Sequence, residues 1–356
     1  MRKNILFLPV LLLLLTACGA SQSPAVTDGN APYATDGNWY ATSGDYAYYA
    51  EPYATDGDAY DYSTQNVLYA TDGNVDRAAL KTVRVSTVEE LLDAIAPETE
   101  VLLAPGEYNL SQCTPGLYRH CYFHPCFPAD DEVSNELVLC NLYNCVIASE
   151  TGNCEDVTLI AEPRTAAVLT LEDSSGIQLR GLTLGHTEGA ICTASVLKLQ
   201  NSGSIYIEDC ELYGCGTTGI DCLSCYGVTA RGGLIRDCSY NAVELMTSES
   251  ILIDGVTFRN VGEQMVFNVM NSHWVEVQNC AFEQNLPLNF LCERWSDHVF
   301  FDDCSFTENS FYSLFSLISC DPPQLSGCEI PYEQYLRPYE NTATGVIALQ
   351  DGKEWE

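Results

Sequence analysis

One repeating pattern, which begins at Ile177, most constrains how this chain can fold. Each copy has apolar residues at offsets 0, 2 and 7 and a turn-forming residue at offset 4. The copies begin at Ile177, Ile205, Val228, Ile251, Val275 and Val299, and their spacings are 28, 23, 23, 24 and 24 residues. Offset 4 holds Gly181, Asp209, Gly232, Gly255, Asn279 and Asp303, all of which tolerate a left-handed backbone. Every copy is therefore predicted to bend sharply between two short strands.

A third short strand precedes each of the later copies. Its alternating apolar positions are Leu197/Leu199, Ile220/Cys222, Val243/Leu245 and Phe267/Val269. Three short strands per repeat, with no helical segment between them, are typical of one coil of a parallel β-helix. Neighbouring coils stack at about 4.8 Å, so residues at equal offsets form ladders along the molecule. The sequence thus predicts an all-β solenoid over residues 81–335, with about 23–24 residues per coil.

A short helix is expected at the N-terminal end of this solenoid. Ser86 and Glu89 have the spacing of a capping box, with Ser86 as the N-cap. Apolar residues then recur at helical spacing until Pro97, namely Val88, Leu91, Leu92 and Ile95. Such a helix would close the open end of a solenoid, whose core and strand edges are otherwise exposed.

The segments outside the solenoid have a different character. Residues 1–17 combine Arg2 and Lys3 with an apolar run, which is typical of a signal peptide, and residues 15–18 (Leu-Thr-Ala-Cys) resemble a bacterial lipobox. That resemblance implies lipidation of Cys18 and a location on the extracytoplasmic face of the cell membrane; the alternative is an ordinary signal peptide. Residues 18–80 repeat Tyr-Ala-Thr-Asp-Gly units with few aliphatic side chains, which predicts a disordered tether. Residues 336–356 form a C-terminal tail.

The net charge of −34 limits the partners. Like-charge repulsion argues against nucleic acid, and it disfavours polyanionic glycans unless divalent cations bridge the charges. The same repulsion favours a soluble monomer.

Residues 83–309 resemble the right-handed parallel β-helix proteins of the pectin-lyase-like superfamily, and the narrower resemblance is to bacterial β-helix lipoproteins. The segments 177–187 and 210–216 carry this likeness. It implies a right-handed fold, and the superfamily includes polysaccharide lyases and glycoside hydrolases. The chain departs from the polygalacturonase pattern, because residues 185–187 (Gly-His-Thr) match only partly and there is no Arg-x-Lys. That particular activity is therefore not expected.

The 18 cysteines divide into two groups. Cys210, Cys280 and Cys304 share offset 5, and Cys215 and Cys238 share offset 10; these are expected to be buried thiols, although adjacent-coil pairs such as Cys280/Cys304 lie within disulfide reach. An insertion at residues 113–154 is the second group. Disulfides are favoured there over free thiols or a zinc site with His120 and His124, because exported proteins use them as staples. The disulfide candidates are Cys113, Cys121, Cys126, Cys140, Cys145 and Cys154, together with Cys320 and Cys328 near the C-terminus.

Candidate site residues lie around the 28-residue coil. Its extra residues predict a protruding loop at 185–192, in which His186 would be a general base. The outward positions of the third strand place Lys198, Asp221, Glu244 and Asn268 in one row, where Asp221 and Glu244 would be a catalytic carboxylate pair or a calcium site. Tyr213 and Arg236 are expected to flank this row, and together with Lys198 they are the predicted binding residues. The alternative is a row of ordinary solvated side chains.

These observations support two functions. The favoured one is a non-catalytic, surface-anchored module that interacts with polysaccharide, because the sequence contains no unambiguous set of catalytic residues. The alternative is a polysaccharide lyase or glycoside hydrolase that uses His186, Asp221 and Glu244.

Overall fold

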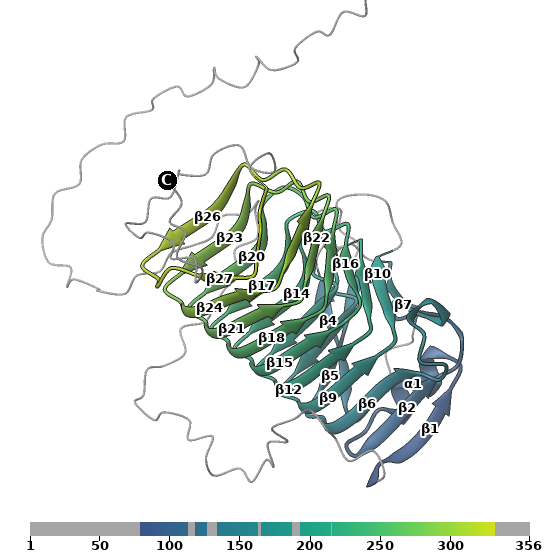
Figure 1. Cartoon of the computed structure of the whole chain (residues 1–356). Coiled ribbons are helices and arrows are strands. Elements are labelled where there is room, and N and C mark those ends of the chain that lie inside the picture. The colour runs from purple at the N-terminus through teal and green to yellow at the C-terminus, as the bar shows by residue number, and fades with distance from the viewer. Residues whose placement is uncertain are drawn as a thin grey trace, which may run out of the picture. The chain divides into compact units, whose positions relative to one another are not determined.

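The computed structural model describes residues 79–112, 118–126, 134–162, 165–186, 193–214 and 216–331. They form a right-handed parallel β-helix of about seven turns, whose strands make three long sheets (Figure 1). Both the fold and its handedness are as predicted. The signal peptide, Cys18, nearly all of the tether and the C-terminal tail lie outside the described residues.

Sheets A, B and C run along the three sides of the solenoid. Sheet A contains β1 (Lys81–Val85), β2 (Thr99–Leu103), β6 (Tyr143–Ser149), β9 (Ser175–Arg180), β12 (Gly203–Glu208), β15 (Tyr226–Arg231), β18 (Glu249–Asp254), β21 (His273–Gln278), β24 (Asp297–Asp302) and β27 (Gln324–Ser326). Sheet B contains β3 (Gly106–Asn109), β7 (Val157–Ala161), β10 (Thr183–His186), β13 (Glu211–Tyr213), β16 (Leu234–Arg236), β19 (Thr257–Arg259), β22 (Ala281–Glu283) and β25 (Ser305–Thr307). Sheet C contains β4 (Cys121–Cys126), β5 (Ser134–Cys140), β8 (Leu169–Glu172), β11 (Leu197–Gln200), β14 (Thr218–Leu223), β17 (Asn241–Met246), β20 (Met265–Met270), β23 (Asn289–Arg294) and β26 (Ser313–Ile318).

The predicted repeat offsets are the ladders of the structure. Ile205, Val228 and Ile251 are consecutive partners in sheet A, and all three are buried. At offset 7 the rings of Phe258 and Phe306 stack on either side of Phe282, with centroids 5.1 and 4.9 Å away. Apolar side chains at equal offsets therefore fill a continuous core.

Each corner between two sheets has its own ladder of capping side chains. Between sheets A and B these are thiols, as where Cys280 bonds to the carbonyl oxygen of Gln278 at 3.2 Å. Between sheets B and C, Asn285 donates to the carbonyl oxygen of Phe258 at 3.0 Å. Between sheets C and A, Ser248 donates to the carbonyl oxygen of Met246 at 3.0 Å. These bonds satisfy buried backbone groups that the bends remove from the sheets.

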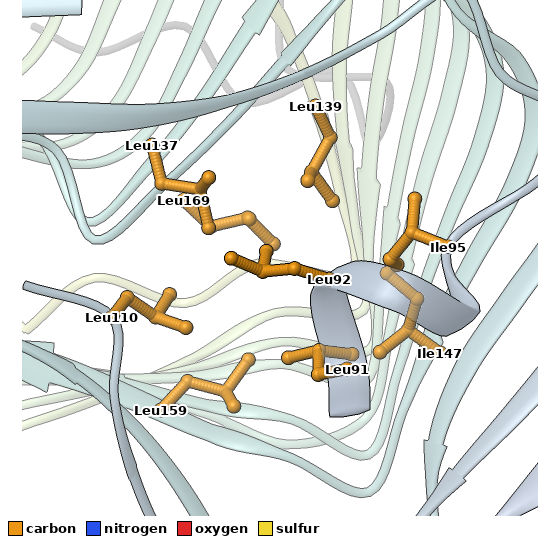
Figure 2. A pocket seen from close by; sticks show the side chains of 9 residues that line it. All are labelled: Leu91, Leu92, Ile95, Leu110, Leu137, Leu139, Ile147, Leu159 and Leu169. Carbon is orange, nitrogen blue, oxygen red and sulfur yellow. The ribbon is translucent and has the colours of Figure 1, made fainter. Parts of the chain in front are cut away.

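The helix α1 (Val88–Ala94) covers the N-terminal end of the core, as predicted. Figure 2 shows Leu91 and Leu92 pointing toward Leu110, Leu159 and the aliphatic side chains of the first coils. The void between them is about 10 Å³ and is lined only by aliphatic residues, so it has no polar partner to hold a water.

The predicted N-cap of α1 was wrong by one residue. Thr87, not Ser86, is the N-cap, and its side chain accepts from the backbone N–H of Glu90 at 3.2 Å. Glu90 in turn accepts from the backbone N–H of Ser86 at 2.7 Å. Sequence spacing did not distinguish Ser86/Glu89 from Thr87/Glu90, since both pairs have the capping-box separation. No helix among the described ranges is long and apolar enough to cross a membrane.

The Cys-rich insertion contains regular structure. Its strand β4 pairs with β5 in the antiparallel sense and forms one edge of sheet C. The same stretch also contains β6, which belongs to sheet A.

Most of the expected disulfides at the two ends are not formed. Cys140, Cys145, Cys154, Cys320 and Cys328 are free thiols. The physical reason is that they stand in different ladders: Cys145 faces the core, Cys320 bonds to the carbonyl oxygen of Glu293 at 3.6 Å, and Cys328 contacts Cys304.

Of the remaining cysteines in the insertion, Cys121 is buried in β4. Cys113 and the side chain of Cys126 lie outside the described residues. The prediction of a buried free thiol is wrong for Cys238, which is disulfide-bonded. Cys215, which shares its offset, lies outside the described residues.

Candidate functional site

The predicted row forms on sheet C. Lys198 pairs with Asp221, Asp221 with Glu244, and Glu244 with Asn268, in consecutive strands. Glu136 joins the row at its N-terminal end, where its carboxylate lies 3.9 Å from the Lys198 ammonium. The ladder position of the two carboxylates is therefore as expected from the repeat.

The environment of the row differs from a solvated face. Asp221 accepts a hydrogen bond from the hydroxyl of Ser195 at 3.0 Å. Glu244 accepts from the Asn268 amide at 3.0 Å and from the Asn241 amide at 3.2 Å. Burial, followed by the neighbouring Glu244 carboxylate, outweighs the opposite effects of Lys198 and Ser195 and raises the pKa of Asp221 to about 6. Side chains from neighbouring loops and coils thus partly cover both carboxylates.

Among the described residues, no third His, Cys, Asp or Glu side chain joins Asp221 and Glu244 at the predicted calcium site. Within the part of the chain that the structure describes, no group of three or more His, Cys, Asp or Glu side chains is arranged to hold a metal ion. Calcium requires six to eight oxygen ligands, and the oxygens of Glu244 already accept hydrogen bonds from amides. The described residues of the insertion likewise contain no group of three or more His, Cys, Asp or Glu side chains that could hold zinc.

His186 is not positioned as a general base. It ends β10, is only 5% exposed, and its Nε2 lies 2.9 Å from the carbonyl oxygen of Ala166. Burial lowers the pKa of this imidazole. The expected role fails because the side chain points into the corner between sheets B and C; residues 187–192 of the predicted loop are outside the described ranges.

Tyr213 and Arg236 lie on sheet B, whereas the carboxylate row lies on sheet C. The Arg236 guanidinium packs over the Tyr213 ring, 4.7 Å from its centroid, and its Nε lies 2.6 Å from a carboxylate oxygen of Glu211. The expectation that they flank the row is therefore wrong. Each coil bends between the two sheets, so residues close to the row in sequence can lie on a different face. They form a separate stacked pair.

Sequence reasoning missed a second group, on the outward face of sheet A. The indole of Trp274 in β21 stacks on the imidazole of His298 in β24, with ring centroids 4.0 Å apart and planes 22° apart. Trp274 is 48% exposed, although bulky apolar side chains are usually buried. We call Trp274, His273, Asp297 and His298 the aromatic–histidine patch.

One carboxylate orients both histidines of this patch. Asp297 Oδ1 lies 2.7 Å from Nδ1 of His298 and 2.9 Å from Nδ1 of His273. These hydrogen bonds, with His298 contributing most, lower the pKa of Asp297. With Nδ1 of each ring bonded to the carboxylate, each Nε2 is left for other contacts.

A sequence signal for the patch existed in the residue before each repeat start. That position holds Asn144, Gly176, Ser204, Gly227 and Ser250 in the earlier coils, all at positive φ. Trp274 and His298 occupy it with φ of 56° and 55°. A left-handed backbone is unfavourable for a bulky residue. The change from small residues in the earlier coils to Trp and His at the same position therefore indicates a role other than folding.

A hollow of about 380 Å³ lies elsewhere on the surface. It is lined by Arg259, Glu283, Gln284, Thr307 and Glu308. The Arg259 guanidinium lies 2.7 Å from a carboxylate oxygen of Glu283. This pair neutralises itself, and Glu308 leaves the hollow with a net negative charge.

Comparison with known proteins agrees with this architecture. Residues 167–330 match the family model described as "Right handed beta helix region". The ladder register shows the parallel β-helix that the repeat predicted, and the family match agrees with the right-handed fold that the resemblance implied. A search of curated proteins found no matching relative.

Among solved structures, the chain is similar to an alginate lyase from Paenibacillus sp. str. FPU-7, with 12% identity, a TM-score of 0.44, and coverage of 74% of this chain and 99% of that one. It is similar to a pectate lyase from Paenibacillus sp. 0602, with 8% identity, a TM-score of 0.44, and coverage of 71% and 80%. It is also similar to a polygalacturonase from Erwinia carotovora ssp. carotovora, with 11% identity, a TM-score of 0.41, and coverage of 74% and 96%.

Proposed function

We propose that this protein is a non-catalytic, lipid-anchored module that binds neutral polysaccharide through the aromatic–histidine patch. The observation that carries the proposal is the exposed Trp274 ring, stacked on His298 and standing on a regular, outward sheet face. Tyr and Trp are favoured in binding sites because they combine a large apolar surface with a polar group. Here the ring offers a flat apolar platform, and the Nε2 atoms of two histidines lie beside it.

A polymer suits this surface better than a small molecule. Small-molecule ligands are usually held in concave pockets that bury most of their surface, whereas the patch lies on a strand face whose coils repeat every 4.8 Å or so. An extended sugar chain would contact several coils at once. The net charge of −34 disfavours acidic glycans, so a neutral polysaccharide is the better candidate.

The anchor and tether belong to the same proposal. Lipid on Cys18 would hold the protein at the extracytoplasmic face of the membrane. If residues 18–80 are disordered, as their composition predicts, a segment of about sixty residues would span roughly 45 Å on average and would raise the solenoid above the lipid surface. The patch would then meet polysaccharide outside the cell.

The test is the binding of a panel of neutral and acidic polysaccharides to the whole chain, with and without calcium, measured by calorimetry. Trp274→Ala should weaken binding of the bound glycan by about tenfold or more, equivalent to about 1.4 kcal/mol. Tyr143→Ala is the matched control, because Tyr143 is an equally exposed aromatic residue of sheet A, in the distant strand β6. Equal affinity of both variants and the wild type would remove the patch from the proposal.

One observation favours a hydrolase or lyase as a second candidate. Asp221 has a raised pKa and stands one rung from Glu244, and pairs of carboxyl groups in different environments act as acid and base in glycosidases. Release of reducing ends or unsaturated products by the wild type, and its loss in Asp221→Asn, would support an enzyme. Catalysis that is intact in Asp221→Asn would exclude this pair.

A further inference from the structure

Three cysteines occupy the same corner of three consecutive coils. Cys280, Cys304 and Cys328 directly precede Ala281, Ser305 and Glu329, which are partners in one parallel ladder. Cys280 and Cys304 are buried, and Cys328 is half-buried at the last described coil. All three are free thiols at the corner between sheets A and B.

Their sulfur atoms contact one another along the ladder. Cys304 lies in side-chain hydrogen-bonding contact with Cys280 on one side and with Cys328 on the other. The contact with Cys304 lowers the pKa of Cys280 and raises the pKa of Cys328. A thiol with a lowered pKa forms the attacking thiolate more readily, so Cys280 is the better nucleophile of the three.

We propose that these thiols form a disulfide site in which Cys304 bonds to either Cys328 or Cys280. Neighbouring coils are about 4.8 Å apart, which lies inside the Cα separation of roughly 4.4–6.8 Å that a disulfide bridges. Cys280 and Cys328 are two coils apart, about twice that spacing, and are out of reach of each other. Cys304 is therefore required in every bridge of this site.

The chemistry balances with a low-molecular-weight disulfide, such as oxidised glutathione, as the oxidant. Cys280 is the better nucleophile but is buried, so the half-buried Cys328 is the thiol that the small disulfide can reach. Cys328 loses its proton, attacks this disulfide and forms a mixed disulfide, and the leaving thiolate takes up a proton and departs as one reduced thiol. Cys304 then attacks Cys328 and releases the second reduced thiol, so two protein thiols are oxidised and one small disulfide is reduced. Attack of Cys280 on the sulfur of Cys304 would next move the bond by one coil, and Cys328 would leave as a thiolate with no net oxidation.

Such a bond would staple the C-terminal coils. The terminal coil of a solenoid has a neighbour on one side only and is the place where the ladder begins to open. A covalent link between adjacent coils limits that opening and can be placed on either of two rungs. The site thus adds a redox-dependent closure to the end of the β-helix.

The experiment is oxidation of the whole folded chain with oxidised glutathione, alkylation of the remaining thiols, and peptide mapping by mass spectrometry. The wild type should contain one disulfide at this site. Cys280→Ser should leave the 304–328 bond, and Cys328→Ser should leave the 280–304 bond but form it more slowly, because its two cysteines are buried. Cys304→Ser should contain no disulfide among the three.

Cys210→Ser is the matched control. Cys210 occupies the same corner, but the next two coils carry Gly233 and Val256 there, so this variant should match the wild-type pattern. Serine retains a hydrogen-bond donor for the corner carbonyl groups, and the wild-type map does not depend on any variant. A 280–328 disulfide in Cys304→Ser, or three fully alkylated thiols in the oxidised wild type, would overturn the proposal.

Discussion

Glu293 occupies in β23 the inward position that Val269 occupies one coil earlier in β20. Both side chains are fully buried, and neither carboxyl oxygen of Glu293 has a hydrogen-bond partner among the described residues. Burial, together with the negative charges of Asp321 and Asp297, raises the pKa of Glu293 to about 8. The core of this coil therefore contains a carboxyl group that is protonated at neutral pH.

This relationship predicts a pH-dependent stability. The unfolded chain loses the Glu293 proton near pH 4.5, whereas the folded chain keeps it up to about pH 8. Between these values the folded state binds more protons, so the contribution to stability is full below pH 4.5 and is lost as the pH rises through 8. Glu293→Leu should flatten this dependence and increase the free energy of unfolding at pH 8 by about 1–3 kcal/mol.

Urea unfolding between pH 4 and 9 at constant ionic strength would measure how the free energy of unfolding depends on pH. Glu276→Gln is the control, because Glu276 is an exposed glutamate on the outward face of sheet A. The assignment of Glu293 fails if both variants have the same pH profile as the wild type.

Phe282 tests the aromatic ladder. Its ring is fully buried and stacked between Phe258 and Phe306, so Phe282→Ala should leave a cavity and cost about 3–5 kcal/mol of stability. Leu286→Ala, at a residue that is 62% exposed, should change the free energy of unfolding by less than about 0.5 kcal/mol. Chemical denaturation of the two variants provides the comparison, and a loss below about 1 kcal/mol at Phe282 would contradict the core position.

Gly233 tests the bend between sheets A and B. Its φ is +81°, and an added Cβ would collide with the backbone oxygen of Cys210, so Gly233→Ala should cost more than about 1 kcal/mol. Gly255 also has a positive φ, but the nearest atom to an added Cβ is 3.9 Å away. Gly255→Asn should be close to neutral, because Asn279 adopts the same conformation at the equivalent offset. Equal thermal stability of the two variants would count against this account.

Cys18 tests the membrane anchor. If residues 15–18 form a lipobox, Cys18→Ala should move the protein from the membrane fraction to the soluble fraction, since one or more acyl chains supply the membrane affinity. Fractionation with mass spectrometry of the N-terminal peptide would detect both the shift and the missing acyl groups. A variant that stays acylated and membrane-bound would show that the anchor lies elsewhere.

Much of the fold was readable from local chemistry. The repeat is a short-range signal: offset 4 must tolerate positive φ, and offsets 0, 2 and 7 are apolar. Parallel stacking of the coils then fixes the ladder register. The partners Lys198, Asp221 and Glu244 followed from this register alone. The N-cap shift from Ser86 to Thr87 shows the limit of such reasoning, because two pairs with the same spacing are distinguished only by the backbone that they adopt.

The sequence by itself determined the coil, its bends and the columns in which residues stack, because these depend on backbone conformation and side-chain alternation within one repeat. Only the tertiary structure decided which of the three faces a residue occupies and what covers it. It separated Tyr213 from the carboxylate row, buried His186 in a corner, and brought Trp274 onto His298. Stacking, burial and raised pKa values arise from neighbours one or more coils away in the chain, and no local pattern contains them.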